Sequence, residues 1–289
     1  MKVIRQFWFH LRDFSSTPYF IELVVISTIS ACVIQRMGVR AWGGDSYDAF
    51  IRSFIIGLWG SCTAAAGIIG FERSKGTLIY LVSSRTNSYT ALVSVVVSAS
   101  TFGLAALPLS LVIWLFPGDS AMAIQDLVKR LPQIIIGLLL LWVATSVIAC
   151  VVAALFVLTP NATTYEGLIL VPALFLSGTF SGTGEGMIED IVRVSAFIFP
   201  PTSAVATLYG HPVFNGFNTS SYASSITDSG ISDKTIAVAP YSGSEEPGIS
   251  LLGNAALCLI LCIVWMFMAY ALAHLALRRA RIDATLELF

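Results

Sequence analysis

Charged residues are scarce in this chain of 289 residues: only 11% are Asp, Glu, Lys or Arg, whereas 56% are hydrophobic. A soluble domain usually carries about 25% charged residues. The formal net charge is −1, so the sequence offers no basic surface of the kind that binds nucleic acid. The composition therefore predicts a polytopic membrane protein that contacts a lipid bilayer and no nucleic acid.

Metal-ligating and nucleophilic residues are also few. Three histidines lie far apart in the sequence, and five cysteines all fall within apolar runs. We expect the cysteines to be small buried side chains rather than disulfide partners or metal ligands. Because no nucleophile–base pair and no cluster of His, Asp or Glu at one depth is visible, we expect no catalysis, no metal and no cofactor bound by this chain itself.

Long apolar runs with at most one charged residue are abundant in the sequence. A helix that crosses the ~30 Å hydrocarbon core needs roughly 20 apolar residues. The expected fold class is therefore all-α, with one transmembrane domain over residues 1–289. Six runs approach the required length: 18–35, 51–71, 88–116, 132–158, 164–180 and 250–277.

The lysines and arginines orient these spans, because basic residues favour the cytoplasmic side. With the N-terminus in the cytoplasm, nine basic and four acidic residues lie inside, and the outer loops hold seven basic and eleven acidic residues. The inner basic clusters are the N-terminal segment, the loop after the second span and the C-terminal tail. We expect a multi-pass plasma-membrane protein with both termini in the cytoplasm.

Residues 187–208 do not fit a simple span. The segment is apolar but contains Pro200-Pro201, and only the glycine-rich "SGTGEG" separates it from the fifth span. We expect a re-entrant helical hairpin, since non-helical backbone at membrane depth is tolerated only against protein or a water-filled cavity. A seventh full span is the alternative. The Ser-, Thr- and Gly-rich residues 209–249 are expected to form an external loop.

The N-terminal stretch "MKVIRQFWFHLRDF" has apolar residues at spacings of three or four: Ile4, Phe7, Trp8, Leu11 and Phe14. This pattern predicts an amphipathic helix over residues 2–15 at the cytoplasmic interface, with Trp8 at headgroup depth. Two roles stay open for it. The helix either anchors the chain only, or passes force between a soluble partner and the first span.

One compact charged stretch, "ERSKGTLIYLVSS", follows the second span. It is not a phosphate-binding loop, because that pattern places the lysine after its second glycine, whereas Lys75 precedes Gly76 here. A small apolar stripe at helical spacing follows: Leu78, Leu81 and Val82. The stretch predicts either a short amphipathic helix over residues 72–85 that lies along the cytoplasmic surface, or a solvated loop that only sets the topology.

In its place between the second and third spans, "ERSKGTLIYLVSS" resembles the acidic-basic-x-x-Gly-Thr segment in the membrane subunits of type-2 ABC exporters. A weaker similarity is "LFLSGTF…VSAFIFPPTSAV", which resembles the small-residue end of that family's fifth span, with its following apolar segment and proline step. Relatives often carry a proline soon after the "SG" turn, and "SGTGEG" takes its place here. The resemblance covers essentially the whole chain.

This resemblance implies that residues 72–85 form the coupling helix that contacts a separate ABC ATPase subunit. The implied contact residues are Glu72, Arg73, Lys75, Gly76, Thr77 and Leu78. ATP and magnesium would bind that ATPase, and a second copy of the permease or a related permease would complete a dimer. The implied function is export of a drug-like, lipid-like or other amphipathic substrate.

The alternative is an ATP-independent secondary transporter or channel, which would need buried ionisable residues near the bilayer midplane. The second, third, fourth and sixth predicted spans have no central charge.

Small residues also recur every four positions along the second span: Ser53, Gly57, Ser61 and Ala65. A ridge of small residues lets helices approach closely. Two interpretations stay open: the ridge lies near the dimer axis and lines the transport path, or it packs inside one subunit.

Overall fold

The computed structural model describes residues 2–74, 88–116, 124–158, 166–180, 191–192, 194–210 and 247–286, and each element in these ranges is a helix. The elements are α1 (Lys2–Ser16), α2 (Pro18–Trp42), α3 (Ser46–Ser74), α5 (Ser88–Phe102), the 3₁₀ turn η1 (Gly103–Ala105), α6 (Ala106–Leu115), α7 (Ile124–Lys129), α8 (Leu131–Leu158), α9 (Glu166–Leu176), α11 (Pro200–Tyr209) and α12 (Pro247–Leu286). Four helical stretches in this part of the chain are long and apolar enough to cross a membrane: Pro18–Trp42, Tyr89–Leu115, Leu131–Val157 and Leu251–Ala276. In the ranges that the structure describes, the chain thus has the all-helical architecture typical of a membrane protein.

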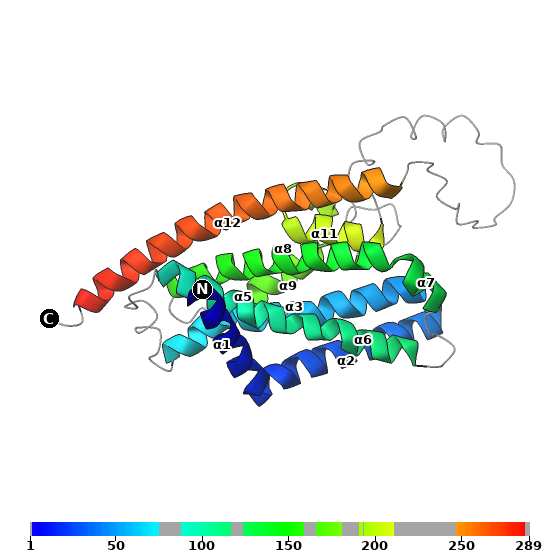
Figure 1. Ribbon diagram of the computed structural model, residues 1–289, viewed down its shortest axis with the longest axis horizontal. Helices are drawn as coiled ribbons and strands as arrows, with labels where there is room; N and C mark the ends of the chain where they lie inside the picture. Colours follow the sequence, from blue (N-terminus) through cyan, green and yellow to red (C-terminus); the bar gives the residue numbers. More distant parts are fainter. Residues whose placement is uncertain are drawn as a thin grey trace, which may run out of the picture.

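The long helices run side by side, and α8 lies at their centre (Figure 1). In the most apolar 18-residue window of α8, 67% of the residues are buried, against 22% for α2 and 17% for α12. Helix α1 lies across the bundle axis at one end (Figure 1), which we call the α1 end. The opposite end, where α3 and α8 begin, is called the far end. Helix α12 runs the length of the bundle and projects beyond it at the α1 end (Figure 1).

Helix α2 is longer than the run predicted at 18–35, because it continues to Trp42. Arg36, which was expected to lie outside the span, reaches the end of α6. Its Nη1 donates a hydrogen bond to the carbonyl oxygen of Ile113 at 2.9 Å, and its Nη2 donates to that of Phe116 at 2.8 Å. The carbonyl groups at the end of a helix lack intrahelical partners. The two hydrogen bonds from Arg36 therefore satisfy carbonyls at the end of α6 and link α2 to α6.

Helix α3 also exceeds its predicted run of 51–71. At its start, the side chain of Asp45 accepts a hydrogen bond from the Tyr47 backbone N–H at 3.0 Å, which is the usual role of an N-cap aspartate. At the other end the helix continues through Glu72 and Arg73. Helix α3 therefore extends three residues beyond the predicted run.

The predicted run 88–116 is helical throughout most of its length, but the 3₁₀ turn η1 interrupts it between α5 and α6. A mid-helix 3₁₀ turn often marks strain or a hinge. Gly103 lies so close to α3 that an added Cβ would collide with Ser61 Oγ. Pro108 follows in the first turn of α6 and has no N–H to donate to Leu104. The close approach and the proline together account for the irregular segment.

The region predicted as a span at 164–180 and a hairpin at 187–208 consists of short pieces. Helix α9 ends at Leu176, and α11 is ten residues long. Between them, residues 191, 192, 194 and 195 are helical and Phe199 is extended. Neither helix reaches the roughly 20 residues that a crossing needs. Within the described residues, the two predicted runs that are not among the four long apolar stretches are that of α3, whose helix has 29 residues, and that of α9 itself.

Candidate functional site

The α1 end brings together residues of four helices. Phe14 of α1 is buried in one apolar cluster with Ile68 of α3 and Leu92 of α5. Its ring also contacts Phe20 at the start of α2, with a centroid distance of 4.9 Å. Phe14 thus belongs to an apolar cluster that joins α1, α3 and α5 at this end.

The predicted coupling segment leaves the bundle at this end. Glu72 and Arg73 lie on the last turn of α3, four and five residues beyond Ile68. The remaining predicted contact residues, Lys75, Gly76, Thr77 and Leu78, lie outside the described residues, as does most of 72–85. The segment 75–87 joins α3 to α5, and both of these helices contribute residues to the apolar cluster that contains Phe14 of α1.

Helix α1 presents its predicted apolar residues on two faces rather than one. Phe7 and Leu11 are half-buried and lie on the side of Phe14, at the i, i+4, i+7 spacing of one helix face. Ile4 and Trp8 point away from the bundle, with 64% and 63% of their surfaces exposed. The sequence did not separate these faces, because spacings of three and four place both sets on one broad stripe.

The ridge of small residues on α3 packs inside the subunit. Ser53, Ser61 and Ala65 are buried, and an added Cβ on Gly57 would collide with Thr28 Oγ1 of α2 and lie 3.0 Å from the Cβ of Ala106. In this conformation, residues of other helices of the same chain lie against the ridge.

A polar arrangement at the far end was not predicted. Tyr47 of α3 donates its hydroxyl hydrogen to the carbonyl oxygen of Leu208 at 3.0 Å. Gln133 of α8 donates from Nε2 to the carbonyl oxygens of Thr207 and Leu208, each at 3.0 Å. The last turn of α11 is thus tied to two long helices, and Gly210 ends α11 in the left-handed conformation with φ 76°.

At the far end, Arg130 lies beside Tyr47, and Arg52 lies near Tyr209. The guanidinium of Arg130 lies 4.4 Å from the centroid of the Tyr47 ring, a cation–π arrangement. Burial raises the pKa of Tyr47 to about 12, although Arg130 acts in the opposite direction. Burial also raises the pKa of Tyr209, which the nearby Arg52 guanidinium partly offsets. Both phenols therefore stay protonated and act as neutral hydrogen-bonding groups at neutral pH.

The segment before α11 is also held through side chains that bond to backbone. The carbonyl oxygen of Leu176, at the end of α9, accepts hydrogen bonds from Ser195 Oγ and Thr202 Oγ1, each at 2.8 Å. Trp265 of α12 donates from Nε1 to the carbonyl oxygen of Ile198 at 2.8 Å. These donors supply partners for backbone that no regular helix satisfies.

The sequence did not predict the hydrogen bonds of Tyr47 and Gln133 to α11, because their acceptors are backbone carbonyls, which every residue has. One usable signal was present. Gln133 is a polar residue directly after Pro132 at the start of the most apolar run, and a buried amide needs hydrogen-bond partners.

No metal site or disulfide accompanies either end within the described ranges. These ranges contain no group of three or more His, Cys, Asp or Glu side chains that could hold a metal ion. All five cysteines are unpaired and buried, as predicted. Comparison of the chain with protein families, curated proteins and solved structures gives no match.

Proposed function

We propose that this chain is the membrane subunit of an ATP-driven exporter of the type-2 ABC kind, which works with a separate ATPase and moves a drug-like, lipid-like or other amphipathic substrate across the plasma membrane. One observation carries the proposal. Phe14 of α1, Ile68 of α3 and Leu92 of α5 belong to one buried apolar cluster at the α1 end, and the charged end of α3 with Glu72 and Arg73 follows Ile68 in the same helix. A partner that pushes on residues 72–85 would therefore act on α1 and two long helices at once.

In the proposed topology the α1 end faces the cytoplasm, together with both termini. The six-span scheme adds α3 and the region of α9 to the four stretches that are both long and apolar enough to span. Residues 187–208 form the re-entrant hairpin, with α11 as its returning arm. The contacts of Leu176 with Ser195 and Thr202 support this arm lying against the end of α9.

The proposed mechanism is a shift between two states of the bundle that differ at the coupling segment. A partner can shift such an equilibrium only by its differential affinity for the two states. ATP and magnesium act on the ATPase, which closes as a pair and therefore requires two permease halves. The far-end ties of Tyr47 and Gln133 to α11 hold the outer side closed in one state and release it in the other.

Affinity purification tests the proposal. The full chain is purified in mild detergent after co-expression with its chromosomal neighbours, and we expect a soluble ATPase at one copy per permease. Glu72→Ala or Gly76→Pro should release or uncouple that ATPase without loss of insertion. Glu22→Ala is the matched control, because Glu22 is an exposed glutamate on α2. A chain that purifies alone and transports without ATP would contradict the proposal and favour a secondary transporter or channel.

A further inference from the structure

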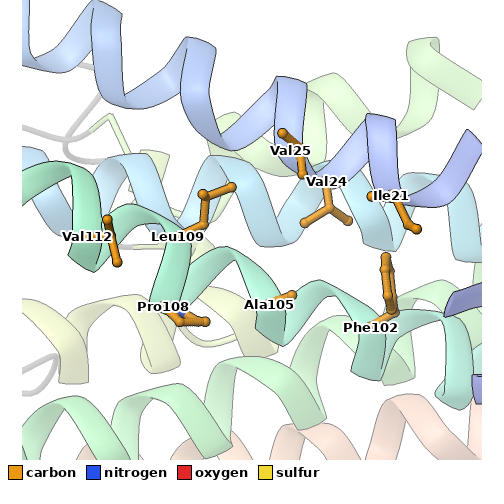
Figure 2. Close-up of a pocket in the computed structure, with 8 residues that line it drawn as sticks. All are labelled: Ile21, Val24, Val25, Phe102, Ala105, Pro108, Leu109 and Val112. Carbon is orange, nitrogen blue, oxygen red and sulfur yellow. The ribbon is translucent and has the colours of Figure 1, made fainter. Parts of the chain in front are cut away.

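A cavity of about 390 Å³ opens between α2 and α6 on the flank of the bundle (Figure 2). One wall is formed by Ile21, Val24 and Val25 of α2. The other wall comes from the α5–η1–α6 path and includes Phe102, Ala105, Pro108, Leu109 and Val112. Every lining side chain is apolar, and Figure 2 shows the two walls facing each other along the helices.

The cavity follows from the way each wall is held elsewhere. Helix α2 is drawn onto α3 by close contacts at Gly57, and at Gly60, where an added Cβ would lie 2.9 Å from Ser27 Oγ. The opposite wall is displaced by η1, which Gly103 sets against Ser61 of α3. Since α2 and the α5–η1–α6 path are each fixed to α3, neither can move to close the space between them.

One end of this groove is shut. The Arg36 side chain crosses from α2 to the carbonyl oxygens of Ile113 and Phe116 beyond Val112. The other end, at Ile21 and Phe102 (Figure 2), is near the start of α2. A long, narrow ligand would therefore enter from the side of the α1 end.

The apolar surface around the groove indicates which kind of molecule can occupy it. Both walls belong to helical stretches that are apolar and long enough to span a membrane. The neighbouring surface is apolar as well, since Ile26 and Val112 have 62% and 63% of their surfaces exposed. Water is a poor occupant because ordered water needs two to four polar partners, and an empty space would forfeit the dispersion contacts of its walls. Hydrocarbon from the bilayer is the medium that reaches it.

We propose that one acyl chain of a membrane phospholipid, from the leaflet on the side of the α1 end, occupies this groove. Lipid chains are as apolar as the groove itself, so transfer gains no hydrophobic free energy. The gain comes from dispersion contacts with two fixed walls. The lipid should therefore outlast detergent extraction without being permanent. The inference requires that the chain spans a bilayer, as the proposed function does, but it does not depend on an ATPase.

A photoreactive phospholipid tests the inference. A lipid with a diazirine on its acyl chain is incorporated into membranes that contain the full chain, and adducts are mapped after illumination and purification in mild detergent. We expect adducts concentrated on residues 102–112 and on the start of α2. Ala105→Phe, which fills the groove, should abolish these adducts and remove one co-purifying phospholipid per chain. Ala271→Phe is the matched control, because Ala271 is an exposed alanine on α12, and it should change neither quantity.

A second groove-filling variant keeps the test possible if the first variant misfolds. If Ala105→Phe fails to fold, Val25→Phe blocks the groove from the opposite wall. Adducts spread equally over the groove and the exposed face of α12 would overturn the inference, as would full lipid retention in a folded groove-filled variant. Absence of adducts from the groove, together with disulfide formation between two chains that each carry Val112→Cys, would identify a second copy as the occupant instead. Loss of the ATPase partner in the purification above would leave the adduct pattern unchanged, so the two proposals fail separately.

Discussion

The hydroxyl of Tyr47 donates a hydrogen bond to the carbonyl oxygen of Leu208 at 3.0 Å, although 161 residues separate the two in sequence. The same oxygen accepts a second hydrogen bond from Gln133 Nε2. Because the last carbonyls of a helix have no intrahelical donor, these two side chains satisfy α11 where it ends. The contact links the starts of α3 and α8 to the segment that we propose as the returning arm of the hairpin.

Removal of these donors should loosen α11 in a graded way. Tyr47→Phe deletes one hydrogen bond and leaves Gln133 on the same acceptor, so we expect a loss of about 1 kcal/mol in the free energy of unfolding. Gln133→Ala deletes two bonds and should cost more. Since both donors share the Leu208 carbonyl, the double variant should deviate from additivity. Denaturant titration in detergent measures all three, and strictly additive losses would contradict the shared-acceptor geometry.

Alkaline pH should destabilise the far end through Tyr47. Burial raises its pKa in the folded state to about 12, whereas a tyrosine in an unfolded chain titrates near 10. The folded state therefore binds the proton more tightly, and the resulting stability is fully present below pH ~10 and lost as pH rises toward ~12. The free energy of unfolding of the wild type should fall in this window. Tyr47→Phe should flatten the fall, and an identical profile for both proteins would show that Tyr47 is not its source.

Gly137 should tolerate no side chain. Its added Cβ would lie 2.6 Å from Leu208 Cδ2, and overpacking of this kind costs about 1–3 kcal/mol. The better helix propensity of alanine stabilises the helix by at most about 1 kcal/mol, so Gly137→Ala should lower the free energy of unfolding. Gly38→Ala is the control, because its Cβ would meet only the Trp42 ring at 3.8 Å, and it should be neutral or stabilising. Thermal unfolding of the two variants compares them directly.

The long helices were predictable because uncharged runs of sufficient length have few alternatives in a bilayer. Their ends were less predictable, since each end depends on a distant partner. Helix α2 passes residue 35 because Arg36 finds the carbonyls of Ile113 and Phe116. No property of residues 18–42 alone indicates those acceptors.

The candidate sites likewise combine features that the sequence predicted with contacts that it did not. The amphipathic pattern predicted α1, but only the structure shows that Phe14 is buried whereas Trp8 is exposed. The four-residue spacing on α3 indicated close packing, and the structure shows which helices it packs against. The ties of Tyr47 and Gln133 depend on backbone acceptors and on contacts between distant segments, so spacing along the chain could not predict them.

Phe14 should carry the docking of α1. Phe14→Ala removes a ring that is 5% exposed, and such truncations in a core cost about 3–5 kcal/mol. Phe9→Ala removes the same ring from a position that is 69% exposed, where changes are usually within about 0.5 kcal/mol. We expect limited proteolysis to cut α1 faster in Phe14→Ala and at the wild-type rate in Phe9→Ala. Equal cutting of both variants would show that the Phe14 cluster does not hold α1.

Cysteine labelling should establish the orientation that we propose. The five native cysteines are buried, so they should contribute little background to reaction with a membrane-impermeant thiol reagent. In intact cells, Ser229→Cys should react from outside, and Trp42→Cys should do so as well, because Trp42 is 88% exposed at the far end. Ser74→Cys, at the end of α3, should react only after the membrane is permeabilised. The reverse pattern would place the α1 end outside the cell, where no cytoplasmic ATPase could reach Glu72.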